Sequence, residues 1–313
     1  MSNESGFLSI SVLMPVYNAE KYIKAAVESI LKQTFTDYEF IIINDGSTDG
    51  TLKILEDYAL QDKRIRLISR ENKGLVATLN EGLGLADAPL IARMDADDIS
   101  LENRFMLQKQ YLDKHPDILC VSGSYEIIDE QSRLITRLDV PLDSEQISKQ
   151  LLKGHCPMVH PATMFRKAVI DKVGDYAGKF LHAEDYDLWL RFDEYGKLAN
   201  LPDLLIQYRY SNSSISSKHT KKQLDSAKKA CEAAWSRKKI IGGIFEPTGD
   251  WRPSKEKSSE YKYLLKLAWW AYNYNQLKTA LFYGYKAVTL NLWGKPAWVL
   301  VACVLGRFLG VKK

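Results

Sequence analysis

The chain has few cysteines and no apolar run long enough to cross a bilayer. Its 313 residues include four scattered cysteines that form no CxxC pair: Cys120, Cys156, Cys231 and Cys303. This spacing does not suit a zinc site, so we expect reduced, cytosolic thiols. The longest apolar stretch, residues 296–311, is shorter than the ~20 residues that span a bilayer, and Arg307 interrupts it. It can lie on a membrane but should not cross one.

The sequence also shows no pattern typical of a secretory leader and no compact histidine motif. The N-terminal segment contains Glu4 and has neither a basic part nor an apolar part after it, so we expect no signal peptide and a cytoplasmic location. Three histidines fall in one stretch, but their spacing matches no zinc motif: His155, His160 and His182. We expect these three to be hydrogen-bonded structural residues.

Charge is unevenly distributed along the chain. Residues 216–313 hold 19 Lys and Arg against 6 Asp and Glu, a net charge of +13, whereas residues 1–215 carry a net charge of −9. An acidic first part is a poor binder of nucleic acid unless a metal intervenes, and a basic tail is attracted to anionic surfaces. The charge of the tail is equally well explained by a solvated helical face.

Strand-like and helix-like segments alternate at the start of the chain. Apolar runs predict buried strands at 8–16, 39–43, 65–69 and 90–94. Helical spacing between them predicts helices at 19–32, 51–60 and 74–86. This alternation predicts right-handed βαβ crossovers, and therefore an α/β fold built on a largely parallel sheet.

The rest of the chain departs from this alternation. A helix is expected at 104–115, antiparallel pairing within 118–142, and a further helix from Glu184. From residue 218 onward helix-like stretches dominate, with a helical hairpin at 259–290. We therefore divide the chain into a larger domain at 1–217 and a basic α-helical region at 218–313.

Polar clusters follow three of the predicted strands. They are Tyr17-Asn18, the segment from Asn44 to Ser47, and the segment from Asp95 to Asp98. In parallel sheets of this kind, ligands bind at the carboxyl ends of the strands. The three clusters therefore predict one shared crevice.

The most informative cluster contains Asp95, Asp97 and Asp98. Three carboxylates within four residues repel one another unless a cation compensates. Their hard oxygen atoms suit Mg²⁺ or Mn²⁺, which would also bridge a diphosphate. The alternative is a helix cap, with Asp97 or Ser100 capping a helix that starts near Leu101.

Two other positions offer carboxylates. Asp45 ends a buried strand and could accept hydrogen bonds from a base or a ribose, or it could simply close a well-formed turn. Glu184 and Asp185 begin a helix in which Asp187 and Arg191 form an i,i+4 pair. An acidic residue there could be a general base for a hydroxyl, or only a partner of the helix dipole.

With these residues identified, the chain resembles the family 2 glycosyltransferases of the GT-A fold, particularly bacterial enzymes of capsular and surface-polysaccharide assembly. The resemblance covers about residues 8–217 and lies in six segments: SVLMPVYNAEKYI (11–23), QTF with EFIIINDGSTDGT (33–51), ENKGLVATLNEGL (71–83), ARMDADD (92–98), HPATMFRK (160–167) and HAEDYDLWLR (182–191). It implies a Rossmann-like nucleotide-binding mixed sheet flanked by helices. It also implies inverting, metal-dependent transfer of a sugar from a nucleotide-sugar, with UDP expected, to a hydroxyl of a glycan or lipid-linked glycan.

The resemblance also implies roles for individual residues. Those expected around the donor's base, ribose and phosphates are Pro15, Tyr17, Asn18, Asp45, Lys73 and Asp95, with Arg209 facing the phosphates. Asp95 and Asp97 form the DxD motif, and Asp97 or Asp98 touches the Mn²⁺ or Mg²⁺ ion. Asp185, paired with Glu184, matches the catalytic base, and no covalent enzyme intermediate is expected.

Two other function classes compete with this one. A nucleotidyltransferase would also combine an α/β sheet with acidic metal ligands, but it usually has a Gly-rich phosphate loop near the N-terminus, which 11–23 lacks. A non-catalytic nucleotide-binding scaffold is the other alternative. The complete set of Asp45, Asp95, Asp97 and Asp185 argues against it.

The tail after residue 217 lies outside the shared pattern. Its aromatic residues are expected to pack between helices: Trp251, Trp269, Trp270, Tyr272, Tyr274, Trp293 and Trp298. The competing hypothesis is an interfacial helix within 293–313 that makes peripheral contact at the inner face of the plasma membrane.

Overall fold

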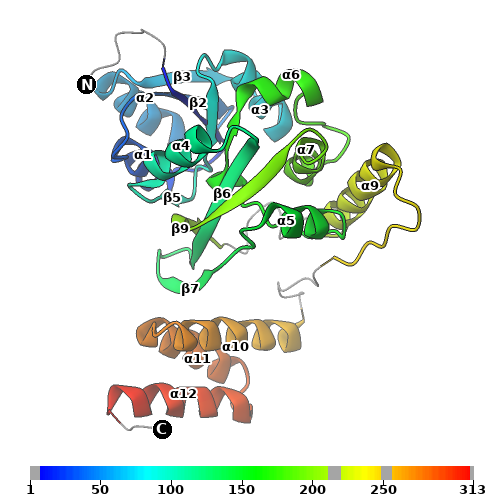
Figure 1. Cartoon of the computed structure of the whole chain (residues 1–313). Helices are drawn as coiled ribbons and strands as arrows, with labels where there is room; N and C mark the ends of the chain where they lie inside the picture. The colour runs from blue at the N-terminus through cyan, green and yellow to red at the C-terminus, as the bar shows by residue number, and fades with distance from the viewer. Residues whose placement is uncertain (1–7, 211–219, 248–255, 311–313) are drawn as a thin grey trace. The chain divides into compact units, whose positions relative to one another are not determined.

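One nine-stranded sheet dominates the computed structural model, which describes residues 8–210, 220–247 and 256–310 (Figure 1). Its strands are β1 (Ile10–Val16), β2 (Tyr38–Asp45), β3 (Ile65–Arg70), β4 (Leu90–Arg93), β5 (Ile99–Ser100), β6 (Ile118–Ile128), β7 (Leu134–Leu138), β8 (Met164–Arg166) and β9 (Lys197–Arg209). They follow the order β3-β2-β1-β4-β8-β6-β9-β5, with β7 paired to β6.

The sheet is mixed. β1 pairs in parallel with β2 and β4, and β2 pairs in parallel with β3. β8 is antiparallel to both β4 and β6. The parallel half predicted from the first four apolar runs is thus confirmed. Strand order reverses beside β1, which is where sheets of this kind bind ligands.

Helices cover both faces of the sheet. The helices of the described residues are α1 (Ile23–Leu31), α2 (Thr51–Gln61), α3 (Leu75–Leu85), α4 (Arg104–Lys114), α5 (Ser144–Leu151), α6 (Ile170–Val173), α7 (Glu184–Phe192), α9 (Thr220–Lys238), α10 (Lys257–Asn273), α11 (Leu277–Leu290) and α12 (Lys295–Phe308), with 3₁₀ turns η1 (His160–Ala162) and η2 (Lys167–Val169). The core on one face includes α1, α2 and α4, and the core on the other includes α3, α5, α7 and α9.

Alternate residues of one strand enter the two cores. In β1, Val12 and Met14 pack with the α1 side of the sheet, whereas Leu13 packs with the α3 side. Successive side chains of a strand point to opposite faces, so a strand covered on both faces reads as a continuous apolar run. This explains why 8–16 shows no alternation of apolar and polar residues.

The chain forms two compact units. The end of β6, β7 and α10–α12 belong to the second unit, and the other elements belong to the first, apart from Arg209 at the end of β9. The predicted boundary at 217/218 lies within 211–219, outside the described residues. Of the described helices beyond it, α9 groups with the first unit. No described helix has the length and hydropathy needed to cross a membrane.

Candidate active site

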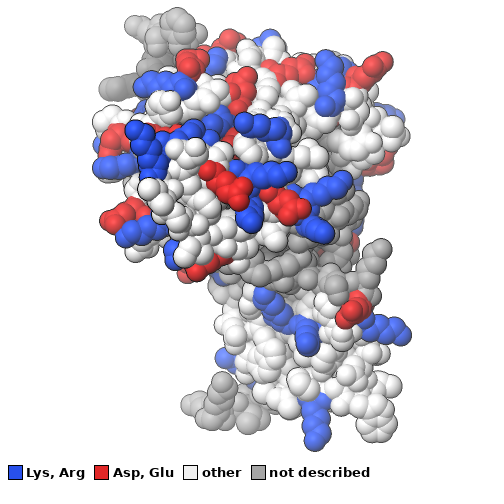
Figure 2. All heavy atoms as spheres, turned by 90° about the vertical axis from the view of Figure 1, so that its right-hand side faces the viewer, with Lys and Arg blue, Asp and Glu red and all other residues white. Residues whose placement is uncertain are grey.

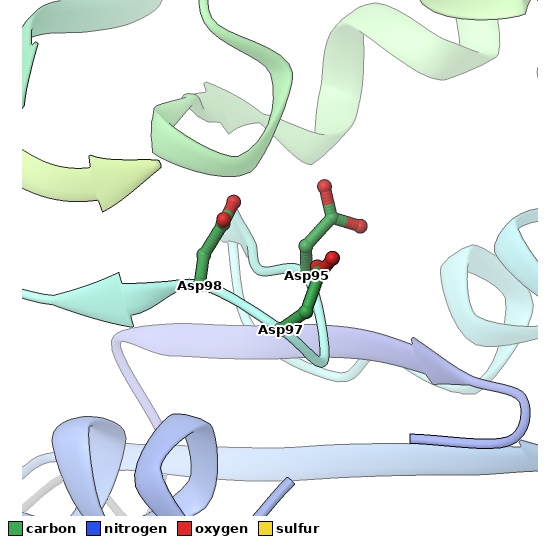
Figure 3. A group of neighbouring side chains, drawn as sticks. All are labelled: Asp95, Asp97 and Asp98. Carbon is green, nitrogen blue, oxygen red and sulfur yellow. The ribbon is translucent and has the colours of Figure 1, made fainter. Parts of the chain in front are cut away.

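The acidic loop, Asp95 to Asp98, connects the end of β4 to β5. Its base is fixed because Met94 N–H donates to the Leu13 carbonyl at 3.0 Å and Arg93 N–H donates to the Thr163 carbonyl at 3.0 Å. The Asp95, Asp97 and Asp98 side chains project to one side of the loop (Figure 3), and one oxygen from each lies within 4.8 Å of the others. Within the described residues this is the one group of acidic, His or Cys side chains close enough to hold a metal ion.

The helix-cap alternative for this loop is wrong. Ser100 lies in β5, where its hydroxyl accepts a hydrogen bond from Gln33 Nε2 at 3.1 Å. The next helix, α4, begins only at Arg104, and its N-cap residue Asn103 makes no side-chain cap. The carboxylates of the acidic loop therefore do not cap α4.

The donor set of the acidic loop fits a divalent cation. Carboxylate oxygens are the hard ligands that Mg²⁺ and Mn²⁺ prefer. Arg93 forms an ion pair with Asp95 and offsets one of the three negative charges.

Arg93 links the acidic loop electrostatically to α7. Its side chain is almost fully buried at the end of β4. Burial raises the pKa of Asp185, and the positive charge of Arg93 opposes part of that rise, while Asp95 adds to it. The acidic loop and Asp185 therefore act on one another through space. The sequence analysis missed Arg93, although a charged residue in an otherwise apolar strand was a usable signal.

Glu184 and Asp185 begin α7 and differ in exposure. Glu184 is buried, whereas Asp185 is half-buried and its Oδ1 accepts a hydrogen bond from Tyr186 N–H at 2.7 Å. Burial raises the pKa of Glu184, and the neighbouring Asp185 charge raises it further. The hydrogen bond from Tyr186 favours the ionised form of Asp185. Asp185 is thus the member of the pair that is accessible and whose carboxylate accepts a backbone hydrogen bond.

A polar chain supports Asp185 from the side of α3. His160 Nδ1 lies 4.0 Å from Asp185 Oδ2, and His160 Nε2 is 2.9 Å from the Tyr176 hydroxyl. The Tyr176 backbone is clamped by Asn80, which accepts from Tyr176 N–H at 2.9 Å and donates to its carbonyl at 3.0 Å. Burial holds the pKa of His160 well below its usual value, so the ring is neutral. His160 is hydrogen-bonded as predicted, but Tyr176 and Asn80 were missed.

The i,i+4 pair predicted in this helix is present. Arg191 Nε donates to Asp187 Oδ2 at 2.9 Å, and its two terminal nitrogens donate to the carbonyls of Val173 and Asp175. The pair therefore ties α7 to the segment that precedes Tyr176.

Asp45 anchors the segment before α3. Its carboxylate accepts hydrogen bonds from Lys73 N–H at 2.7 Å and Gly74 N–H at 2.9 Å and pairs with Arg70. Burial alone would raise the pKa of Asp45, but these donors hold it below its usual value. Asp45 is therefore an anion that sets the position of the Lys73 backbone, while the Lys73 side chain is exposed. The Arg70 contact was not foreseen.

Asn18 joins two strand-end loops. Its N–H donates to Ser47 Oγ at 2.9 Å, and its side-chain oxygen accepts from Thr48 N–H at 2.8 Å. Its φ of 47° is one that asparagine tolerates better than most residues. Tyr17 beside it is 53% exposed, and Pro15 is buried in β1 opposite Ile43. The loops after β1 and β2 thus form one edge, as predicted.

Arg209 is hydrogen-bonded at the turn between β6 and β7. Its side chain is buried, and Nη1 donates to the Asp129 carbonyl at 2.8 Å and to Ser132 Oγ at 2.9 Å. Arg209 belongs to the second unit, where it supports the turn between β6 and β7. A role at the donor phosphates has no geometric support.

Several curated bacterial glycosyltransferases are similar to the chain. An uncharacterized glycosyltransferase of Haemophilus influenzae is 36% identical over 70% of this chain and 71% of its own length. The Escherichia coli UDP-Glc:alpha-D-GlcNAc-diphosphoundecaprenol beta-1,3-glucosyltransferase WfgD is 33% identical over 69% of this chain and 84% of its own length.

Solved structures also share the fold of the chain. Residues 1–349 of Staphylococcus aureus TarS, in complex with UDP-GlcNAc, match with a TM-score of 0.53 and 17% identity, covering 96% of this chain and 80% of that one. The mannosyltransferase PcManGT of Pyrobaculum calidifontis, in complex with GDP-Man and Mn²⁺, matches with a TM-score of 0.54 and 16% identity, covering 99% and 82%. The mixed α/β sheet is therefore a GT-A fold.

The family itself is given by the sequence. The profile described as Glycosyl transferase family 2 matches residues 11–174, which include β1, the acidic loop and His160. This match takes in more than half of the chain. The protein is therefore a glycosyltransferase and belongs to glycosyl transferase family 2.

Proposed function

We propose that this glycosyltransferase moves a sugar from a UDP-sugar to a hydroxyl of a glycan or lipid-linked glycan, in surface-polysaccharide biosynthesis, with inversion at the anomeric carbon. The observation that carries the proposal is the arrangement of the acidic loop and Asp185 around the buried Arg93. Such an arrangement places a cation-binding group and a general base within electrostatic reach of each other.

The donor would lie along the edge made by the β1, β2 and β4 loops. Pro15, Tyr17, Asn18 and Asp45 are assigned to the base and ribose, and Lys73 and Asp95 to the ribose and phosphates. The backbone that presents Lys73 is held by Asp45, so its position does not depend on the donor. The choice of UDP is supported by the names of WfgD and of the TarS complex, whereas PcManGT binds GDP-Man.

Asp95, Asp97 and Asp98 would hold Mn²⁺ or Mg²⁺. A bound divalent cation supplies positive charge where the departing diphosphate becomes more negative. The Mn²⁺ in the PcManGT complex supports this assignment. The ion pair with Arg93 orients the Asp95 carboxylate, which a ligand for the cation requires.

Asp185 would act as the general base of a single displacement. The acceptor oxygen forms its bond to the anomeric carbon while the bond from that carbon to the diphosphate oxygen breaks. The hydroxyl proton passes to Asp185, and the electron pair of the broken bond leaves with UDP. Positioned proton removal of this kind contributes roughly 10²- to 10⁴-fold in rate.

The acceptor determines where the enzyme works. WfgD acts on a sugar linked to diphosphoundecaprenol, and its similarity to this chain supports a lipid-linked acceptor here. We therefore place the enzyme in the cytoplasm at the inner face of the plasma membrane, with peripheral contact through the C-terminal region.

The test is nucleotide release with a panel of UDP- and GDP-sugars, with Mn²⁺, with Mg²⁺ and with a chelator. Metal-dependent release from one UDP-sugar, and a product whose anomeric configuration by NMR is opposite to that of the donor, are expected. Release from GDP-sugars alone would overturn the choice of UDP, and a product of unchanged configuration would overturn inversion. Turnover that is unaffected by the chelator would contradict the metal assignment.

A further inference from the structure

Helix α12 exposes an apolar face that nothing in the described chain covers. Its buried side chains, Ala297, Leu300 and Val304, pack inward. The outward apolar side chains of α12 and its two ends form what we name the α12 patch: Leu292, Trp293, Trp298, Val299, Leu305, Phe308 and Leu309. Within the helix, Leu305 follows Trp298 by seven residues and Phe308 by three more, so these three lie along one side of α12.

The α12 patch is unusual because seven large apolar residues are strongly exposed within a short segment of the chain. Trp293 is 93% exposed and Leu309 is 81% exposed. The polar atom of Trp298 is already used, since its Nε1 donates to the Leu292 carbonyl at 2.9 Å. Single exposed apolar residues are ordinary on a protein surface, but a large continuous patch marks an interaction site.

The C-terminal helices α10–α12, to which the α12 patch belongs, carry an excess of basic residues. Residues 256–310 contain seven Lys and Arg against two Glu, and all the basic side chains except Lys266 are exposed: Lys257, Lys262, Lys266, Lys278, Lys286, Lys295 and Arg307. In the lower part of Figure 2, the C-terminal helices are mostly uncharged and show more Lys and Arg than Asp and Glu. An anionic surface complements this charge, whereas a second copy of the same helices would bring like charges together.

We infer that the α12 patch is the surface by which the protein lies on an anionic phospholipid membrane. The 14 residues of α12 extend about 21 Å, which is less than the ~30 Å hydrocarbon core, so the helix lies along the surface. Trp293 and Trp298 enter the headgroup zone, where indole rings are favoured, and the lysines meet anionic headgroups. This inference rests on the proposed function in one respect. It names the residues that make the peripheral membrane contact proposed above.

The test is flotation of the full-length protein with phosphatidylcholine vesicles, with and without phosphatidylglycerol. The wild type should bind the anionic vesicles, and bind them less at high salt. The double variant Trp293→Glu/Leu309→Glu should bind the vesicles at least about tenfold more weakly. It places two negative charges where apolar side chains would enter the membrane. Leu60→Glu/Ile241→Glu is the matched control, since it adds the same charge at two equally exposed apolar positions outside the patch and should bind as the wild type does.

Other results would overturn the inference. These are a wild type that does not float with anionic vesicles, or equal weakening by the patch variant and the control. A wild-type dimer that the patch variant converts to a monomer, without vesicle binding, would assign the patch to a second copy of the chain. Trp293→Ser adds no charge and should weaken binding to a smaller degree, which keeps the test decisive if the double variant fails to fold.

Activity separates this inference from the proposed function. Nucleotide release with a water-soluble acceptor should be the same in the patch variant and the wild type. Failure of the wild type to transfer sugar would count against the proposed function and leave the vesicle result intact.

Discussion

At the scale of single residues, the chemistry depends on which carboxylate at the start of α7 carries the charge. We predict that Asp185→Asn lowers kcat roughly 10²- to 10⁴-fold, because it removes the proton acceptor. Glu184→Gln should lower kcat by less than about tenfold, because burial and the Asp185 charge already favour the protonated form of Glu184. Initial rates of nucleotide release measure both. Equal losses in the two variants would contradict the assignment of the base to Asp185.

The same residue should set the acidic limb of the pH profile. Asp185 accepts a proton only when ionised, and burial raises its pKa. We therefore predict that kcat falls on acidification at a pH above roughly 3.9, the usual value for an aspartate. The profile of kcat against pH measures this in the wild type. In Asp185→Asn the residual rate should lose this limb, and a limb that persists there would assign it to another group.

Asp97 tests the metal site. Asp97→Asn removes one negative ligand from a group whose oxygens lie within 4.8 Å of one another. We predict a loss of roughly 10²- to 10³-fold in kcat, as for the loss of other transition-state charge stabilisation, with a higher Mn²⁺ concentration needed for half-maximal rate. Asp87→Asn is the control, because Asp87 is an exposed aspartate outside the site. A metal requirement that Asp97→Asn leaves unchanged would exclude Asp97 as a ligand.

At the scale of elements, Gly82 allows α3 to pack closely against the sheet. A Cβ on Gly82 would collide with the Leu13 side chain of β1, whereas one on Gly84 of the same helix would meet nothing within 4 Å. We predict that Gly82→Ala destabilises the protein by about 1–3 kcal/mol through overpacking. Gly84→Ala should stabilise it by about 0.5–1 kcal/mol, because alanine favours the helix. Urea unfolding measures both, and destabilisation of similar size in the two variants would contradict close packing at Gly82.

Helices and strands whose apolar residues repeat regularly over many positions could be predicted from the sequence. Short elements, and those whose pattern is interrupted, could not. β1–β4 and α1–α4 are covered on at least one side, so burial imposes a readable pattern on them. β8 has three residues, too few for a period, and β9 contains Pro202, a residue that argues against a strand in the sequence. Both strands are stabilised by pairing with distant segments, which composition does not reveal.

The same reasoning applies to the site. The acidic loop and the Glu184-Asp185 pair could be predicted because their chemistry is local in the sequence. Arg93 contacts Asp95, and Tyr176 contacts His160, only in the folded chain. The spacing of these residues in the sequence therefore does not reveal their part in the site. The role of Arg209 stays a prediction, and its contacts with the turn after β6 were not visible in the sequence, because they also form only in the fold.

At the scale of the whole molecule, the helices after residue 217 divide between the two units. α9 packs with α5 and α7 in the core of the first unit: Trp235 Nε1 donates to the Leu152 carbonyl at 3.0 Å, and Lys238 pairs with Asp193 at 2.6 Å. α10–α12 group instead with the β6–β7 turn in the second unit. The two units therefore have separate cores, and β6 is the strand that continues from one into the other.

The second unit is centred on Asp129. This buried carboxylate accepts hydrogen bonds from Gln131 N–H at 2.9 Å, from Arg133 N–H and Nε, and from the Tyr283 hydroxyl at 2.9 Å. Burial alone would raise the pKa of Asp129, but these donors hold it below its usual value. Its contribution to stability is therefore present at neutral pH and is lost as pH falls through the lowered folded pKa.

Two cores predict two separable unfolding transitions. Asp129→Ala leaves the buried donors around it without an acceptor, so we predict that it lowers the stability of the second unit by about 2 kcal/mol or more. Tyr283→Phe removes only one of these bonds and should cost about 1 kcal/mol. UDP with Mn²⁺ should raise the transition of the first unit alone, because a ligand stabilises only the unit that binds it. Scanning calorimetry of the full-length protein measures all three shifts. A single transition displaced by both Asp129→Ala and UDP would mean that the two cores unfold together, and that the strand they share transmits stability from the donor site to the C-terminal helices.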